Sequence, residues 1–189
     1  MIEQPQETGN TKSFNLFSMS SGLIAGSAKF SELDDNTTKV EITLMGLDPS
    51  GNHPTHIHNN SGAKGGSIVV SLENVSGASG KSETIISKTD DGTAITYNQL
   101  IDFNGHVNVH ESAANLSSLL AQGDIGPNEL TTNSEDFDLL EINGSGIFGD
   151  VTFVERVSGE ILAIIALEDT PSGGEHPAHI HLNSVASGR

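Results

Sequence analysis

The sequence of 189 residues contains no cysteine, no tryptophan and only one tyrosine. The absence of cysteine excludes disulfides, thiolate metal sites and cysteine nucleophiles, so a metal site would have to use histidine, carboxylate or carbonyl ligands. Because aromatic residues make up only 4% of the chain, the core must consist mainly of Ile, Val, Leu, Ala and the seven Phe. The length still allows one large domain with a substantial core.

Basic residues are also scarce: 8 Lys and Arg stand against 25 Asp and Glu, which gives a formal net charge of −17. Such a charge repels nucleic acids and anionic membrane surfaces and attracts cations. No apolar run is long enough to span a bilayer, so we expect no membrane insertion. The first residues, 1–6, lack a basic and apolar leader, which indicates either a cytosolic chain or one whose leader has been removed.

Short apolar runs separated by turn residues, together with twenty-one glycines, predict an all-β chain. In the segment 39–47, for example, Val40, Ile42 and Leu44 alternate with polar residues. The pattern of 95–103 is ambiguous and leaves a helical turn open, and a loop or helical turn is expected within 112–122. The predicted strands are 14–19, 23–33, 39–47, 68–72, 84–87 and 105–110.

Six of the eight histidines lie in two nearly identical stretches, HPTHIH at 53–58 and HPAHIH at 176–181. Successive side chains of a strand point to opposite faces, so His56 and His58 share one face, as do His179 and His181. Neutral imidazole is a good ligand for copper, zinc, iron and nickel. The pattern predicts a metal site, although histidines beside Gly, Pro and Asn also cap turns or face solvent.

The segment 105–110 contains the other two histidines. Its alternation places His106, Asn108 and His110 on one face and two valines on the other. If this strand lies beside the first histidine stretch, His110 completes a site with His56 and His58. The alternative is that His106 and His110 are ordinary residues on the exposed face of an amphipathic strand.

From Ile24 onward the chain repeats itself at an offset of 123 residues, the distance from His53 to His176. Glycine and hydrophobic positions recur together with the histidines, so a whole structural unit is duplicated. The second copy lacks a counterpart of residues 67–126. These boundaries predict a flexible N-terminus (1–13), a complete unit (14–126), a linker (127–142) and a half repeat (143–189). The recurring pairs include Ile24 and Ile147, Gly26 and Gly149, Phe30 and Phe153, Ile42 and Ile165, Asn60 and Asn183, Ser61 and Ser184, Ala63 and Ala186, and Gly65 and Gly188.

The half repeat would expose apolar residues that invite association. We expect residues 67–126 to pair within 14–126, because consecutive strands are usually neighbours. Alternatively they pair with 143–189, so that His110 joins His179 and His181. A homo-oligomer or strand exchange through the half repeat would then cover what remains exposed. The apolar residues concerned are Ile161, Ile164, Ile165 and Leu167.

The order of these segments resembles the CHRD domain, named after chordin and common in bacterial secreted and surface proteins. The resemblance rests on HPTHIH, the glycine-rich loop after it, IVVSL at 68–72 and VNVH at 107–110, and it covers about 14–126 and 143–189. It implies a Greek-key or immunoglobulin-like β-sandwich in an extracytoplasmic protein (secreted, periplasmic or on the cell surface). The chain departs from the family at 117–123, where SSLLAQG replaces an arginine-containing segment, and at His106, where a tyrosine is usual.

The histidine motifs are also similar to those of copper-zinc superoxide dismutases, in which the last two histidines of an HxxHxH stretch and one from a later stretch bind copper. That likeness implies that His56, His58 and His110 are ligands, and that His53, like His106 and His176, is a supporting residue or an extra ligand. His179 and His181 are the equivalent ligand candidates of the half repeat. The zinc loop of those enzymes has no match here.

The expected function is therefore metal binding, with copper as the first candidate and zinc as the alternative. Superoxide dismutation is the second hypothesis. It is disfavoured because Arg156 and Arg189 are the only arginines and neither is placed to guide an anion, while the net charge repels superoxide. A structural or adhesive module without metal is the third.

Overall fold

The computed structural model describes residues 4–20 and 23–182. These residues form antiparallel strands with one short α-helix and one 3-10 turn, so the all-β prediction is confirmed. Neither helical element of the described chain has the length and apolar character needed to cross a membrane. The elements are β1 (Glu7–Ser18), β2 (Ala25–Leu33), β3 (Thr38–Met45), β4 (Asn52–Asn59), β5 (Ile68–Ser76), β6 (Lys81–Ile86), α1 (Tyr97–Ile101), β7 (Gly105–Ser112), β8 (Asn115–Ile125), η1 (Gly126–Asn128), β9 (Leu130–Leu139), β10 (Phe148–Arg156) and β11 (Ile161–Glu168).

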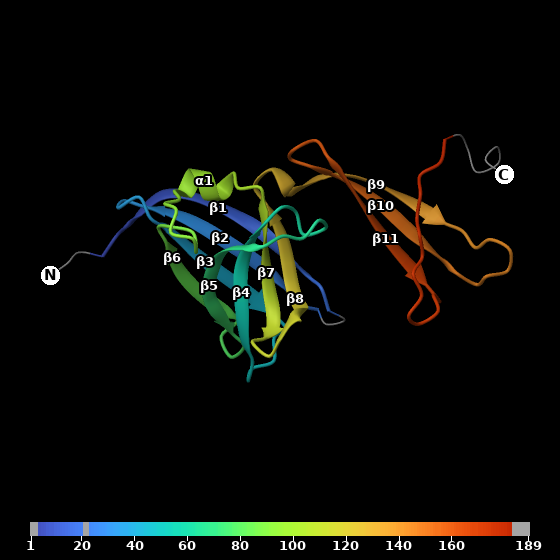
Figure 1. Cartoon of the computed structure of the whole chain (residues 1–189), viewed down its shortest axis with the longest axis horizontal. Coiled ribbons are helices and arrows are strands. Elements are labelled where there is room, and N and C mark those ends of the chain that lie inside the picture. Colours follow the sequence, from blue (N-terminus) through green and yellow to red (C-terminus); the bar gives the residue numbers. More distant parts are fainter. Residues whose placement is uncertain (1–3, 21–22, 183–189) are drawn as a thin grey trace. The chain divides into compact units, whose positions relative to one another are not determined.

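The first eight strands form a closed barrel in the order β1-β2-β3-β6-β5-β4-β7-β8 (Figure 1). The sequence predicted a sandwich of two sheets, whereas here both edges are joined. Val40 of β3 pairs with Thr84 of β6, and Phe17 of β1 pairs with Gln122 of β8. Closure leaves no unpaired barrel edge, which protects the barrel from edge-to-edge association.

The alternating residues of the strands fill the barrel as the sequence predicted. Val40, Ile42 and Leu44 are at most 3% exposed, and Phe14 meets Phe30 edge to face with ring centroids 5.5 Å apart. The helix α1 is fixed by a capping box between Thr96 and Gln99 and buries Tyr97 and Leu100. It occupies part of the segment 95–103, where the sequence left a helical turn open.

Two segments contain more strand than the sequence indicated. Residues 115–122, expected as a loop or helical turn, belong to β8, because Asn108 and Val109 of β7 pair with Gln122 and Ala121 and this ladder overrides the local helix preference. β1 begins at Glu7, inside the expected flexible N-terminus. Glu7 pairs with Leu33 and its carboxylate lies 2.5 Å from the ammonium of Lys39. Residues 1–3 of that terminus lie outside the described part of the chain.

The strands β9, β10 and β11 form a three-stranded sheet in the order β11-β10-β9. They begin at Leu130, Phe148 and Ile161, 123 residues after the starts of β1, β2 and β3. The repeat therefore extends back to residue 7, and β9 occupies most of the expected linker. Side-chain contacts recur as well. The amide of Asn10 donates to Glu32 at 2.8 Å and that of Asn133 to Glu155 at 2.7 Å.

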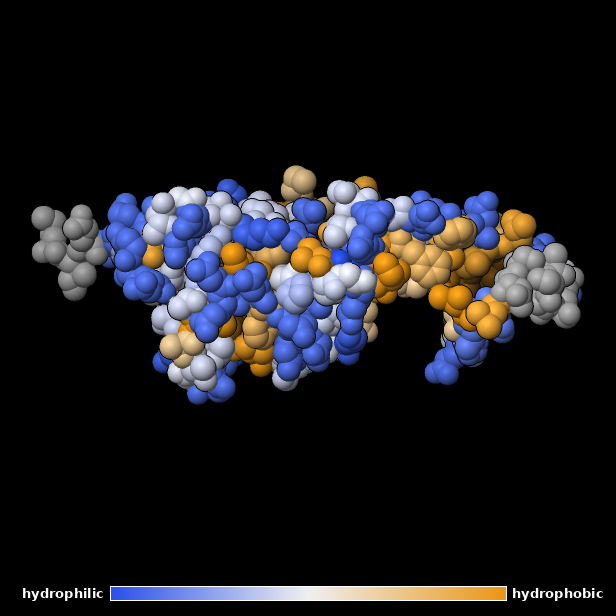
Figure 2. All heavy atoms as spheres, turned by 90° about the horizontal axis from the view of Figure 1, so that it is seen from above, coloured by the Kyte–Doolittle hydropathy of each residue, from blue (hydrophilic) through white to orange (hydrophobic). Residues whose placement is uncertain are grey.

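The apolar face of the sheet β9–β11 is exposed, whereas the equivalent face of β1–β3 is buried inside the barrel. Ile42 is 1% exposed in the barrel, but its equivalent Ile165 is 43% exposed; Phe14 is 1% exposed and its equivalent Phe137 51%. In the barrel these positions are covered by β4–β8, which have no strand counterparts among the described residues. Apolar surface gathers over β9–β11 accordingly (Figure 2). The recurrences at Asn183, Ser184, Ala186 and Gly188 fall outside the residues that the structure describes.

Gly26 provides a test of the β2–β3 pairing. A Cβ added to Gly26 would lie 1.8 Å from the carbonyl oxygen of Thr43, on the paired strand, so an alanine would force the two backbones apart. We expect Gly26→Ala to lower the free energy of unfolding by roughly 2–3 kcal/mol, the range of an overpacked core. Urea unfolding measures this. Ser27→Ala at the next position is the control and should change little; equal effects would contradict the pairing.

Candidate metal centre

Three of the predicted ligands come together on the outer face of the barrel. His56 and His58 lie on β4 and His110 on the neighbouring antiparallel strand β7, where Asn108 pairs with His56. The residue between the two β4 histidines, Ile57, points into the core and is 0% exposed. The period of two along each strand therefore directs the imidazoles away from the core, and the register between the strands brings them together.

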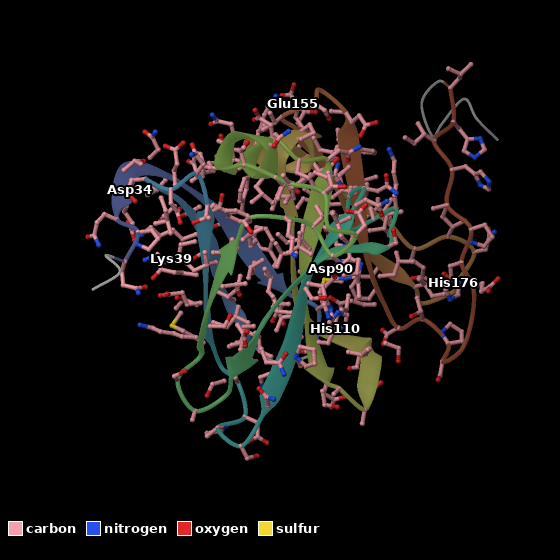
Figure 3. All side chains as sticks on the ribbon, turned by 60° about the vertical axis from the view of Figure 1, so that its left-hand side comes forward. Asp34, Lys39, Asp90, His110, Glu155 and His176 are labelled. Atoms are coloured by element: carbon pink, nitrogen blue, oxygen red, sulfur yellow. The ribbon has the colours of Figure 1, made fainter. Side chains whose placement is uncertain are left out.

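The three rings are close enough to share one ion. One ring nitrogen from each histidine lies within 4.8 Å of those of the other two. The ring centroids of His56 and His110 are 5.0 Å apart, those of His56 and His58 5.8 Å, and those of His58 and His110 6.1 Å. His110 is labelled in Figure 3. Among the residues that the structure describes, no other group of three or more His, Cys, Asp or Glu side chains brings its potential ligand atoms this close together.

Backbone carbonyls fix which nitrogens are free. Nδ1 of His58 lies 2.9 Å from the carbonyl oxygen of Gly66, and Nδ1 of His110 lies 2.6 Å from that of Leu116. Because a carbonyl only accepts, each Nδ1 carries the proton and donates it, which leaves the lone pair on Nε2.

These lone pairs have no protein partner. Nε2 of His58, Nε2 of His110 and Nδ1 of His56 are buried and make no hydrogen bond within the described chain. Most buried polar side-chain atoms in proteins are paired, so each orphan calls for an explanation. Three orphan imidazole nitrogens in one cluster fit a cation that accepts three lone pairs.

The surroundings favour the neutral form of two of the three histidines. Burial is the largest effect that lowers the pKa of His56, followed by the proximity of His110 and His58, while Asp90 opposes it. Burial likewise lowers the pKa of His110; its hydrogen bond with Leu116 opposes the shift and the neighbouring His58 adds to it. Neutral imidazole is the form that binds metal, so both shifts favour the ligand form of His56 and His110.

His53 and His106 flank the cluster as supporting residues rather than members of it. Nδ1 of His53 lies 2.8 Å from the carbonyl oxygen of Glu111, which ties the start of β4 to the residue after His110. His106 is 1% exposed and stacks on His58 with ring centroids 5.0 Å apart and an interplanar angle of 19°. Its Nδ1 bonds to the carbonyl oxygen of Asn60 at 2.8 Å. Burial lowers the pKa of His106 too, so the stacked ring is uncharged.

The histidines of the half repeat form no such cluster. His176, His179 and His181 are exposed and lie on the irregular segment after β11 (Figure 3). The rings of His179 and His181 are 6.2 Å apart, close to the 5.8 Å of their equivalents His56 and His58. The pair is present, but the described half repeat supplies no third imidazole from a strand like β7.

Sequence reasoning did not find the groups that orient the ligands. The carbonyls of Gly66 and Leu116 belong to the backbone and have no side-chain signature. Asp124, whose Oδ2 lies 2.6 Å from Arg156 Nη1, was also missed. The sequence offers no signal for this pair, because the two residues lie 32 positions apart and belong to no motif.

Comparison of the chain with protein-family models, with curated proteins and with solved structures finds no match.

The histidine cluster predicts a pH dependence of folding in the absence of metal. The pKa values of His56, His106 and His110 are lowered in the folded protein, so below about pH 6.5 the unfolded chain binds protons that the folded chain does not. The free energy of unfolding should therefore be fully maintained above that pH and fall as the pH drops through it. Each such group contributes up to about 1.4 kcal/mol per pH unit.

Urea unfolding of metal-free protein at several pH values between about 7.5 and 5 measures this slope. His110→Gln should reduce it, because one proton-binding site is lost. His181→Gln is the control, since His181 is exposed, and should leave it unchanged. A slope that is equal in the two variants would contradict the assignment.

Proposed function

We propose that this chain is a metal-binding β-barrel module that holds one ion through His56, His58 and His110. The observation that carries the proposal is the convergence of three buried, unpaired imidazole nitrogens, two of them held in the required tautomer by backbone carbonyls. Such carbonyl contacts to the remote nitrogen of a ligand histidine are typical of metal sites. Five other buried side-chain atoms of the described residues are also unpaired, Nε2 of His53 among them, so the proposal rests on three such nitrogens belonging to one group of histidines.

Copper is the metal that the donor set favours, with zinc as the alternative. The cluster consists of three imidazoles and includes no carboxylate or thiolate. Asp90, the acidic residue that acts on His56, accepts hydrogen bonds from both the amide and the hydroxyl of Ser71, at 2.9 and 2.8 Å. Imidazole ligands suit both metals, and copper(II) binds more tightly in the divalent series. When bound, copper would supply one-electron redox chemistry and zinc a Lewis acid.

The fold is consistent with a CHRD-type module. The spatial order β3-β6-β5-β4 is that of a Greek key, in which three consecutive strands pair and a fourth lies beside the most distant of them. The same barrel has the two histidine motifs on adjacent strands, β4 and β7, which supports a shared site. The resemblance to the CHRD domain also leads us to propose an extracytoplasmic location. The strong negative charge of the protein favours a cationic ligand over nucleic acid or an anionic surface.

Superoxide dismutation is the second candidate, supported by the order and spacing of the ligand motifs. Charge argues against it. Arg156 is 3% exposed and pairs with Asp124, so it cannot attract an anion to the cluster, and Arg189 lies outside the described residues. With a net charge of −17 in addition, binding is favoured over catalysis.

Replacement of His58 tests the binding site. We expect His58→Ala to abolish uptake of one equivalent of Cu(II) or Zn(II) and to remove the rise in melting temperature that the ion causes, because a ligand stabilises the folded state by mass action. Isothermal titration and thermal unfolding with and without the ion measure the two effects. His181→Ala, the equivalent substitution in the half repeat, is the control. It should leave the tight site intact, and loss of tight binding in that variant alone would overturn the assignment.

A dismutase assay on the copper-loaded protein separates the two functions. If the protein is only a binding module, superoxide should decay no faster in its presence than in the presence of the same amount of chelated copper. His58→Ala should then leave the decay rate unchanged. Activity that depends on His58 and falls with ionic strength would instead establish the enzyme and indicate electrostatic steering.

A further inference from the structure

The glycine-rich loop after β4 holds the carbonyl that orients His58. Residues 61–66 close a turn in which Lys64 and Gly65 donate to the carbonyl oxygen of Ser61, at 3.0 and 2.9 Å. The last residue, Gly66, accepts the hydrogen bond of His58 Nδ1. A Cβ at Gly66 would lie 2.1 Å from the carbonyl oxygen of Asn59, so the loop lies directly against β4. The position of this loop therefore decides the tautomer of His58.

A buried ion pair anchors the loop from the other side. Asp124 of β8 accepts the backbone N–H of Gly62 on Oδ1 at 2.7 Å. Its Oδ2 receives the guanidinium of Arg156 at 2.6 Å, and the two side chains are only 12% and 4% exposed. Arg156 also donates to the carbonyl oxygen of Asn128. Charge-assisted hydrogen bonds of this kind fix geometry, and removal of one partner leaves the other charge buried.

The repeat shows that the strand itself does not require an arginine here. Arg156 ends β10, and its equivalent at the end of β2 is Leu33, a core residue that is 5% exposed. An apolar side chain therefore fits this position in the first copy. Arginine in the second copy is explained by its partner Asp124. The turn that follows contributes another contact to the same loop, between Glu160 and Lys64 at 3.4 Å.

We propose that Arg156 is a positioning residue of the metal centre. It holds Asp124, Asp124 holds Gly62, and the loop thereby keeps the Gly66 carbonyl on Nδ1 of His58, so that Nε2 presents its lone pair to the cluster. The role in metal affinity rests on the proposed function, whereas the role in the tautomer does not.

The test uses Arg156→Leu, which installs the residue of the first copy. The tautomer of His58 is measured by ¹⁵N NMR on the metal-free full chain at about pH 8, where imidazole is ordinarily neutral. We expect the wild type to show a single tautomer with the proton on Nδ1 and the variant to show a mixture. Cu(II) affinity, measured by competition, should fall about tenfold, the lower end of the range for partners of ligand histidines.

Lys12→Met is the matched control, because it breaks another ion pair of the barrel, the 2.7 Å contact with Glu129, without touching the loop. It should leave the His58 tautomer and the affinity unchanged. If Arg156→Leu does not fold, Arg156→Lys replaces it. Lysine keeps the positive charge but lacks the planar guanidinium that donates to both Asp124 and the carbonyl of Asn128, so we expect an intermediate shift of the His58 tautomer. A folded variant with an unchanged tautomer overturns the proposal.

The two proposals fail in different ways. A wild-type protein that takes up no metal refutes the proposed function, while a shifted tautomer in Arg156→Leu would still support the positioning role. Metal binding that survives in the wild type together with an unmoved tautomer in the variant refutes only the role of Arg156.

Discussion

The register between β4 and β7 is the constraint on which the site depends. It places His56 opposite Asn108 and His58 opposite His106, so that His110, two residues beyond Asn108, meets the pair from β4. A shift by one residue would turn the imidazoles into the core and Ile57 and Val107 outward. The buried side of the same strands prevents this, since both of those residues are 0% exposed. Core packing thus fixes the geometry of a site that lies outside the core.

The cluster is stabilised by its surroundings rather than by its own contacts. A buried polar atom without a partner costs about 1–3 kcal/mol, and this cluster has three. Neighbouring carbonyls hold the rings of His58 and His110 through Nδ1 and leave Nε2 unpaired. The barrel therefore sustains an arrangement that is unfavourable without an additional group, as the proposed metal site requires.

The sequence was sufficient for features that depend on the period of side chains along one strand. It predicted the inward face of β3 from Val40, Ile42 and Leu44, and the shared face of His56 and His58. It was insufficient where pairing with a distant strand decides the structure. The segment that forms β8 has three leucines and an alanine that favour helix, and only its ladder with β7 makes it a strand. Closure of the barrel and the carbonyl contacts of Gly66 and Leu116 are equally non-local, so neither is visible in the residues themselves.

The repeat separates the contribution of the motif from that of its context. The first copy and the second carry the same histidine spacing, and β1–β3 recur strand for strand as β9–β11. Yet residues 52–59 form a strand that pairs with β5 and β7, while the equivalent residues 175–182 are irregular and exposed. A His-x-His segment is therefore not a preorganised site by itself. Its strand conformation, its third imidazole and its carbonyl acceptors all come from residues 66–125, which is why only the first copy of the motif belongs to a cluster of three imidazoles.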